Sequence, residues 1–263
     1  MYQQNTDVIF NKRVGPETFL LGLRSGEIAA EAAPGQFVMI QVSHDLNPLL
    51  RRPFSICGTQ GDDLFLVLYR VVGQGTAILS RARKGDRIPV LGPLGRGFEF
   101  PDDQQKPLLV AGGMGTAPLL FLAQAIESRD MIFMAGYRSA DEILSMDEIG
   151  LSNIEPSIST DDGTAGHKGP VTELLEAQLS INSAGAPPVV FACGPLPMLK
   201  RVARHAIDHN IPCQVSLETT MACGIGACQG CAVKSSSPEI RPYYHVCQDG
   251  PVFDVKAIDW KAL

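Results

Sequence analysis

Four cysteines near the carboxyl end of the chain have a spacing that suits a metal cluster. Cys223, Cys228 and Cys231 follow a C-x4-C-x2-C pattern, and fifteen residues separate the third from Cys247. This is the plant-type spacing of a [2Fe-2S] cluster, which two irons share among four thiolates. The glycines between the first three cysteines let the backbone pass close to the sulfides and turn its N–H groups toward them. The spacing therefore predicts a [2Fe-2S] cluster on a tight loop.

A structural zinc site and a pair of disulfides are the other readings of these cysteines. Zinc usually takes two C-x-x-C pairs, whereas this segment has one. The chain holds seven cysteines, an odd number, and its first fifteen residues lack the apolar run of a secretion signal. We therefore expect a reducing, cytoplasmic setting, in which clustered cysteines are more often metal ligands than disulfides.

A cluster carries one electron at a time, so we looked for groups that exchange electrons with it. Residues 51–55 read RRPFS, and YRVVGQGT and GPLG follow at 69–76 and 92–95. An arginine beside a proline-fixed turn and a serine can hold a pyrophosphate through paired hydrogen bonds. Gly75 and Thr76 can offer a backbone N–H and a hydroxyl to the same anion. Each motif alone is as typical of an ordinary loop, and the signal lies in their order.

Two further turns suit a nucleotide. VAGGMGTAPLL (110–120) and ACGPLPMLKRV (192–202) each follow a buried apolar run and precede a helical one. The amino end of a helix attracts phosphate, and ligands of parallel α/β sheets bind where strands end. The first turn is not G-x-G-x-x-G, so the ordinary dinucleotide fingerprint is absent. A nucleotide site and a plain tight turn both remain open for it.

The elements that must position these motifs fall into three stretches. Short β-prone runs such as TFLLGLRS, GQFVMIQVS and DLFLVLYRVVG fill residues 1–101 and predict a small antiparallel barrel. Residues 102–214 alternate strand and helix patterns, which predicts a parallel sheet with crossover helices. Residues 215–263 hold the cysteines. The uncharged stretch 107–126 is broken by glycines and Pro118 and reads as strand, turn and helix rather than a membrane span.

Composition narrows the function class. Hydrophobic residues make up 45% and charged residues 19%, which is typical of a globular protein with a packed core. The net charge of −6 argues against a nucleic-acid surface. We therefore expect neither nucleic acid nor membrane as a partner.

The order RPFS, YRV, GQGT, GGMGTAPLL and CGPLPML resembles the ferredoxin-reductase superfamily. With MACGIGACQGCAV and HVCQDGPVF at the carboxyl end, and STDDGTAGHKGPVTELL at 159–175, the chain resembles the electron transfer subunits of NAD-dependent (class 1B) dihydroorotate dehydrogenases. The resemblance covers essentially the whole chain. It implies an FAD-binding barrel, an NAD-binding α/β domain and a small ferredoxin-like [2Fe-2S] segment.

The resemblance also implies which residues bind each group. The cluster ligands would be Cys223, Cys228, Cys231 and Cys247, and the residues at FAD would be Arg52, Pro53, Phe54, Ser55, Leu68, Tyr69, Arg70, Gly75 and Thr76. The residues beside the nicotinamide of NAD would be Gly112, Gly113, Gly115, Cys193, Gly194 and Pro195. Arg138 and Ser139 follow a predicted strand and can hold the 2′-phosphate of NADP, although the family implies NAD. Asp161 and Asp162 suit either acid–base chemistry or, more simply, a turn near the nucleotide.

These implied binding residues fit an oxidoreductase subunit that has no organic-substrate site of its own. We find no constellation that could take a proton from dihydroorotate. The resemblance implies a separate FMN-containing catalytic subunit in a heterotetramer of two plus two, with electrons passing from FMN through the cluster and FAD to NAD+. An apolar docking patch is expected near the cluster, with Ile225, Pro251, Val252 and Phe253 as candidates unless they belong to the core. The alternatives are a subunit of a ferredoxin:NADP oxidoreductase or sulfide dehydrogenase, and a binding module that has lost redox function.

Overall fold

The computed structural model describes residues 1–43, 45–126, 131–151, 153–181 and 186–263. Within this part of the chain, every helix falls short of the length and apolar content that a membrane span needs. Residues 107–126 instead form a buried strand, a turn and a helix, as the sequence predicts.

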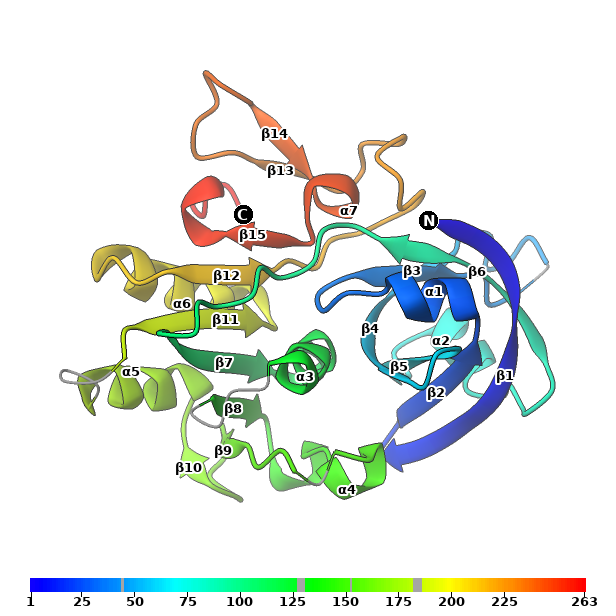
Figure 1. Cartoon of the computed structure of the whole chain (residues 1–263), viewed down its shortest axis with the longest axis horizontal. Coiled ribbons are helices and arrows are strands. Elements are labelled where there is room, and N and C mark those ends of the chain that lie inside the picture. Colours follow the sequence, from blue (N-terminus) through cyan, green and yellow to red (C-terminus); the bar gives the residue numbers. More distant parts are fainter. Residues whose placement is uncertain (44, 127–130, 152, 182–185) are drawn as a thin grey trace.

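Six antiparallel strands close into a barrel in the order β1-β2-β5-β4-β3-β6, with β6 pairing back onto β1 (Figure 1). Along β5 the side chains alternate, because successive residues of a strand point to opposite faces. Phe65, Val67 and Tyr69 enter the barrel interior, whereas Leu66 and Leu68 face outward into the core shared with helix α3. The strands are β1 (Tyr2–Gly15), β2 (Thr18–Arg24), β3 (Phe37–Ile40), β4 (Arg52–Gln60), β5 (Leu64–Arg70) and β6 (Arg87–Leu94), and the barrel helices are α1 (Gly26–Glu31) and α2 (Gln74–Leu79).

The predicted barrel is confirmed, although β1, β4 and β6 lie outside the β-prone runs named from the sequence, and Arg52–Ser55 belong to β4 rather than to a turn. β1 is rich in polar residues and only three of its fourteen side chains are buried, so it lacks a clear hydrophobic alternation. β6 carries prolines, which the sequence pattern assigns to turns.

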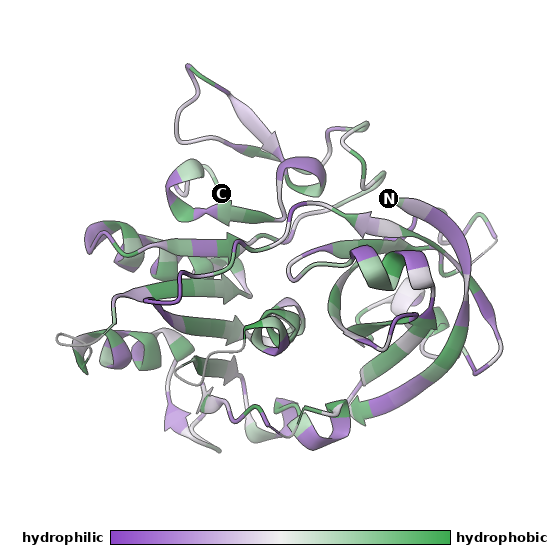
Figure 2. Ribbon diagram, in the orientation of Figure 1, coloured by the Kyte–Doolittle hydropathy of each residue, from purple (hydrophilic) through white to green (hydrophobic). Residues whose placement is uncertain are grey.

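A seven-stranded sheet follows, in the order β10-β9-β8-β7-β11-β12-β15. All neighbouring pairs are parallel except β12 with β15. The central strands are strongly hydrophobic (Figure 2) because both faces are covered. The strands are β7 (Lys106–Gly112), β8 (Ile132–Tyr137), β9 (Ser157–Thr160), β10 (His167–Lys168), β11 (Pro188–Cys193), β12 (Cys213–Ser216) and β15 (Val252–Asp254).

Helix α3 (Thr116–Ala125) lies between the sheet and the barrel (Figure 1). It is apolar on nearly all sides because it packs against both layers, and its core includes Leu20 and Leu68 of the barrel. Helices α5 (Val171–Ile181) and α6 (Leu196–Asp208) cover the opposite face of the sheet. The alternating pattern predicts helices over 116–128 and 139–150. The first ends at Ala125, and residues 127–128 lie outside the described residues. The second divides into η2 (Ala140–Glu142) and α4 (Met146–Ile149).

The carboxyl segment is joined to the sheet rather than appended to it. Strands β13 (Ala232–Lys234) and β14 (Tyr243–His245) form a hairpin, helix α7 (Val246–Asp249) follows, and β15 then pairs antiparallel with β12. The domain boundary expected at 214/215 falls inside β12. Val255 of η3 (Val255–Ala257) and Phe253 are buried with residues of α6 in one core.

Candidate functional site

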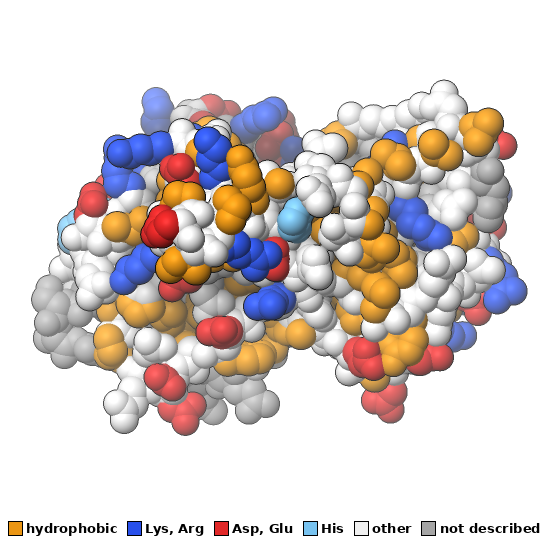
Figure 3. Space-filling model, turned by 90° about the horizontal axis from the view of Figure 1, so that it is seen from above, with side chains coloured by type: hydrophobic (Ala, Val, Ile, Leu, Met, Phe, Trp, Pro, Cys, Tyr) orange, Lys and Arg blue, Asp and Glu red, His pale blue; other side chains and the backbone are white. Residues whose placement is uncertain are grey.

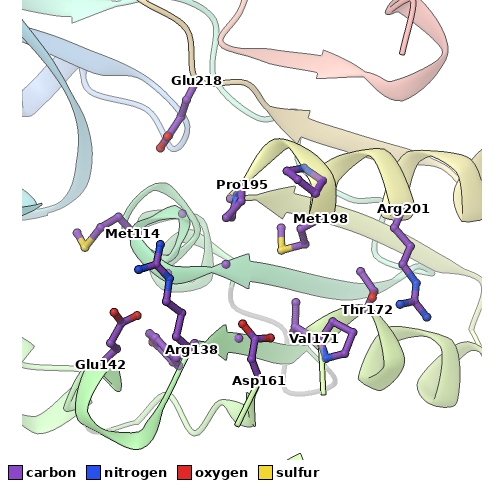
Figure 4. Close-up of a pocket in the computed structure, with 18 of the residues that line it drawn as sticks. Met114, Arg138, Glu142, Asp161, Val171, Thr172, Pro195, Met198, Arg201 and Glu218 are labelled. Atoms are coloured by element: carbon purple, nitrogen blue, oxygen red, sulfur yellow. The ribbon is translucent and has the colours of Figure 1, made fainter. Parts of the chain in front are cut away.

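A cleft of about 690 Å³ opens at the carboxyl ends of the parallel strands, beside the barrel (Figure 4). The strand order reverses between β7 and β11, where crossover connections leave toward opposite faces of the sheet. A crevice at such a point is the usual ligand site of open α/β sheets. The volume suits a bound nucleotide, since ligand pockets commonly measure about 300–1,000 Å³.

The two glycine turns expected at a nicotinamide meet at this point. A Cβ atom on Gly115 would lie 2.2 Å from the carbonyl oxygen of Cys193, and one on Gly112 would lie 2.7 Å from Sδ of Met198. Only glycine allows the two strand ends to approach this closely. Gly113 has φ +52°, with no atom within 4 Å of a Cβ position, so its backbone faces open space. Gly194 and Pro195 complete the floor of the cleft.

Polar atoms without protein partners mark the same cleft. Among the described residues, six buried side-chain atoms lack a hydrogen-bond partner: Arg70 Nε, the Oγ atoms of Ser159, Thr116, Thr172 and Thr219, and the Tyr137 hydroxyl. Arg70, Tyr137 and Thr172 line the cleft directly. Buried polar groups are normally paired, so this concentration indicates that a polar ligand completes their bonding. The glycine floor and the unpaired hydroxyls fit a dinucleotide.

Glu218 is a cleft residue that the sequence reasoning missed. It follows β12 and enters the cleft from the side opposite Arg138, Glu142 and Asp161 (Figure 4). Its side chain is exposed to the cleft, and desolvation by the surrounding protein raises the pKa of its carboxyl. The signal available was its place at the carboxyl end of a predicted strand, the edge at which the other cleft residues gather.

The far end of the cleft has one basic and one acidic side chain. Arg138 and Asp161 follow β8 and β9, and both side chains are exposed. Asp162 is instead engaged in its own turn, where its Oδ1 accepts from the N–H of Thr164 at 2.9 Å. That turn supports the simpler of the two readings for Asp162. Asp161 and Arg138 both line the cleft.

On the barrel, Arg52 and Gly75 are brought together. A Cβ atom on Gly75 would lie 3.1 Å from Arg52 Nε, so glycine lets the guanidinium lie against the start of α2. Pro53, Phe54 and Ser55 are half-buried beside it on β4. Arg70 reaches from the barrel to Glu142 of the α/β part, with Nη1 3.2 Å from Oε1, while its Nε has no partner. Two guanidinium groups along one side of the barrel fit an anionic cofactor such as FAD.

In three other predicted FAD residues, the side chain makes contacts within the protein. The Tyr69 hydroxyl donates to Oδ1 of Asn11 at 3.1 Å inside the barrel, and burial raises the pKa of Tyr69 to about 12. Leu68 belongs to the core around α3. The Thr76 hydroxyl accepts from the N–H of Val72 at 2.9 Å and holds the turn before α2. These side chains shape the surface around the binding residues.

The cysteine loop already directs N–H groups at its sulfurs. The N–H groups of Ile225 and Cys228 point at Cys223 Sγ over 3.5 and 3.4 Å, and that of Gly226 points at Cys247 Sγ over 3.1 Å. Gly226 has φ +78°, and a Cβ there would lie 2.2 Å from Gln248. Such donors stabilise thiolates and bridging sulfides, so the loop fits a [2Fe-2S] cluster.

The first and last of these cysteines differ in acidity. Although burial alone would raise it, the backbone donors of Ile225 and Cys228 lower the pKa of Cys223 to about 6. Burial and the neighbouring Cys231 raise the pKa of Cys247 to about 12. Cys247 therefore depends more than Cys223 on a metal to become a thiolate.

Two of the four cysteines lie in direct contact. Cys231 Sγ and Cys247 Sγ are 3.3 Å apart, longer than the roughly 2.0 Å of a disulfide bond. All seven cysteines are free thiols. In the described part of the chain, no three His, Cys, Asp or Glu side chains stand together as a metal site.

The candidates for an apolar docking patch separate into two groups. Ile225, on the cysteine loop, is 47% exposed, whereas Pro251, Val252 and Phe253 are buried. These three residues therefore belong to the hydrophobic core rather than to a docking patch, because β15 pairs with β12.

Comparisons with known proteins agree with this geometry. Residues 218–259 match the family model described as the iron-sulfur cluster binding domain of dihydroorotate dehydrogenase B. The chain is 38% identical over 252 residues to the "Dihydroorotate dehydrogenase B (NAD(+)), electron transfer subunit" of Desulforamulus reducens, covering 94% of this chain and 95% of that protein. The protein of the same name from Fusobacterium nucleatum is 36% identical, covering 92% and 93%.

Solved structures show the same architecture. A structure reported for an NADH-dependent reduced ferredoxin-NADP oxidoreductase superposes with a TM-score of 0.81 at 29% identity, over 98% of this chain and 91% of that one. A ferredoxin NADP+ reductase from Neisseria gonorrhoeae, with bound FAD and NADP, gives 0.62 at 19% identity, over 79% and 92%, and shows the fold alone.

Proposed function

Because the chain belongs to the family of electron transfer subunits of dihydroorotate dehydrogenase B (NAD+), we propose that it carries electrons from a catalytic subunit to NAD+. It is an oxidoreductase subunit with FAD and a [2Fe-2S] cluster as cofactors and NAD as co-substrate. Dihydroorotate is oxidised on the FMN-containing partner. The observation that carries this proposal is the 38% identity over nearly the whole of both chains, with the four cysteines in the matched cluster-binding segment.

FAD and NAD each have residues suited to bind them. Arg52 and Arg70 hold the pyrophosphate side of FAD, with the half-buried Pro53–Ser55 segment along its edge. The glycine turns after β7 and β11 receive the nicotinamide, and the unpaired hydroxyl of Thr172, which lines the cleft, binds another part of NAD. When bound, FAD supplies the exchange between the two electrons of a hydride and the single electrons of the cluster.

The protein's own groups orient these partners and exclude water. The close approach of Gly115 to Cys193 would leave room for a nicotinamide ring at the strand ends, and Glu218 would offer it a carboxyl from the wall of the cleft. Backbone N–H groups of the cysteine loop stabilise negative charge at the thiolates. The chain thus arranges the three redox groups without an organic-substrate site of its own.

A subunit of a ferredoxin:NADP oxidoreductase is the second candidate, because one such structure matches with a TM-score of 0.81. Its identity to this chain is 29%, below the 38% of the dihydroorotate dehydrogenase relative. We therefore favour the first function. We further propose a heterotetramer of two subunits of each kind, working in the cytoplasm.

The test is electron transfer by the intact complex. The chain is purified with the FMN-containing catalytic subunit of its own organism and mixed with dihydroorotate and NAD+ without oxygen, while NADH absorbance is followed. NADH should appear, and Cys231→Ser should abolish it because the cluster lies on the route. Cys213→Ala, which changes a buried cysteine outside the cluster segment, should keep most of the rate. A complex with flavin and iron–sulfur colour that forms no NADH would overturn the assignment.

A further inference from the structure

A second hollow, a groove of about 1110 Å³, lies between α6 and the carboxyl segment. One wall is the outer face of α6, and the other is the β13–β14 hairpin with the last residues of the chain. Five cations line it, against Asp208 and Asp259: Lys200, Arg201, Arg204, Lys234 and Lys261. In a chain of net charge −6, this excess of positive charge is local.

Most of these cations have no partner in the protein. Arg201 pairs with Glu176, with Nη2 3.0 Å from Oε1. Among the described residues, no ion pair within 4.0 Å involves any of the other four. Clefts lined by one sign of charge attract ligands of the opposite sign. The groove is therefore built for an anionic occupant.

The groove shares a wall with the cluster. The hairpin that forms it is inserted between Cys231 and Cys247, and Lys234 follows Cys231 by three residues. The N–H of Val246 donates to the carbonyl of Cys231 at 3.2 Å, which ties the two ends of the hairpin together. Whatever binds in the groove thus contacts the element that carries two cluster ligands.

The surface around the cluster completes this face. Residues 219–233, which include the first three cysteines, carry no charged side chain, and Ile225 stands exposed among them. Seen from above, the barrel half of the molecule shows a run of hydrophobic side chains, whereas Lys and Arg gather over the half with α6 and the carboxyl segment (Figure 3). An apolar centre beside a charged flank is the usual make-up of a protein interface.

We propose that the groove receives an acidic segment of the catalytic subunit, which docks over the cluster loop. This inference rests on the proposed function. Pro197 and Arg201 line both the groove and the nucleotide cleft, so a role in nucleotide binding is the rival outcome.

The test reverses the charge of α6 with the double variant Lys200→Glu/Arg204→Glu. Binding of the catalytic subunit is measured by calorimetry at low and high salt. The dissociation constant should rise at least about tenfold at low salt, and its salt dependence should become shallower. Arg81→Glu/Lys84→Glu is the matched control, because it makes the same charge change at exposed residues of the barrel. It should leave binding unchanged.

The NADH-to-dye rate of each variant reports an intact fold and cleft. The neutral pair Lys200→Gln/Arg204→Gln serves if the charge reversal does not fold, with a smaller shift in the same direction. Unaltered binding of the catalytic subunit, or a change confined to the KM for NADH, overturns the inference. If the unmodified chain itself fails to bind the catalytic subunit, the proposed function fails instead.

Discussion

At the scale of single residues, Glu218 gives the nucleotide cleft a charge that depends on pH. Burial raises the pKa of its carboxyl above the usual value, so it ionises at a higher pH than in the unfolded chain. A folded state that binds more protons than the unfolded one loses stability as pH rises between the two pKa values. Ionised Glu218 therefore slightly lowers the stability of the folded state at pH values above its pKa. A ligand that pairs with the carboxylate can offset this loss of stability.

We expect the positively charged nicotinamide of NAD+ to be that ligand. Ionised Glu218 attracts the ring, so the affinity for NAD+ should increase as pH rises through the titration of this carboxyl. Glu218→Gln should flatten the dependence, because the amide does not titrate. Dissociation constants of NAD+ measured over a pH series that spans the titration of this carboxyl check this. The same slope in both proteins would exclude Glu218 as the titrating group.

At the scale of elements, β15 makes the cluster segment part of the sheet. Phe253 is 6% exposed in the core that also holds Leu199 and Val202 of α6, and its ring lies 5.5 Å from that of Tyr244 on the hairpin. One side chain therefore connects the sheet, the helix and the hairpin. Loosening it should weaken the cluster and the sheet together.

Phe253→Ala should lower the free energy of unfolding by about 3–5 kcal/mol, as for other large buried side chains. Iron release on heating should shift to lower temperature together with the loss of secondary structure, followed by visible absorbance and circular dichroism. Phe253→Leu, which keeps most of the volume, should shift both less. If Phe253→Ala released iron at a lower temperature while the secondary structure melted at the usual temperature, the cluster segment would fold independently of the sheet.

The elements also show what the sequence could and could not predict. The cysteine loop was predictable because its spacing is local, and β7, β8 and β11 because buried parallel strands are continuous apolar runs. Val252 and Phe253 of β15 were docking candidates with a core position as the alternative, because residues that pair with a strand 36–40 positions earlier leave no local pattern. Glu218 was missed for the same reason: its role arises only when β12 is placed beside the cleft.

At the scale of the whole molecule, electron transfer depends on how the barrel is held against the sheet. Leu20 and Leu68 of the barrel share a core with α3, and Nε2 of Gln124 donates to the carbonyl of Cys57 at 3.1 Å. At the mouth of the cleft, the Arg70–Glu142 pair is the polar link, with each side chain 24% exposed. The apolar core holds the two layers together, and this pair adds a polar link beside the cleft.

Glu142→Gln should therefore slow NADH oxidation more than it destabilises the fold. A partly exposed ion pair contributes up to about 1 kcal/mol, which corresponds to a roughly two- to fivefold lower rate of NADH-to-dye transfer. Glu148→Gln is the matched control, because Lys12 bonds only to the backbone carbonyl of Glu148. It removes the same charge six residues away and should leave the rate unchanged. Stopped-flow measurement of flavin reduction by NADH separates the two variants, and equal rates would mean that the apolar core alone holds the cleft in its working shape.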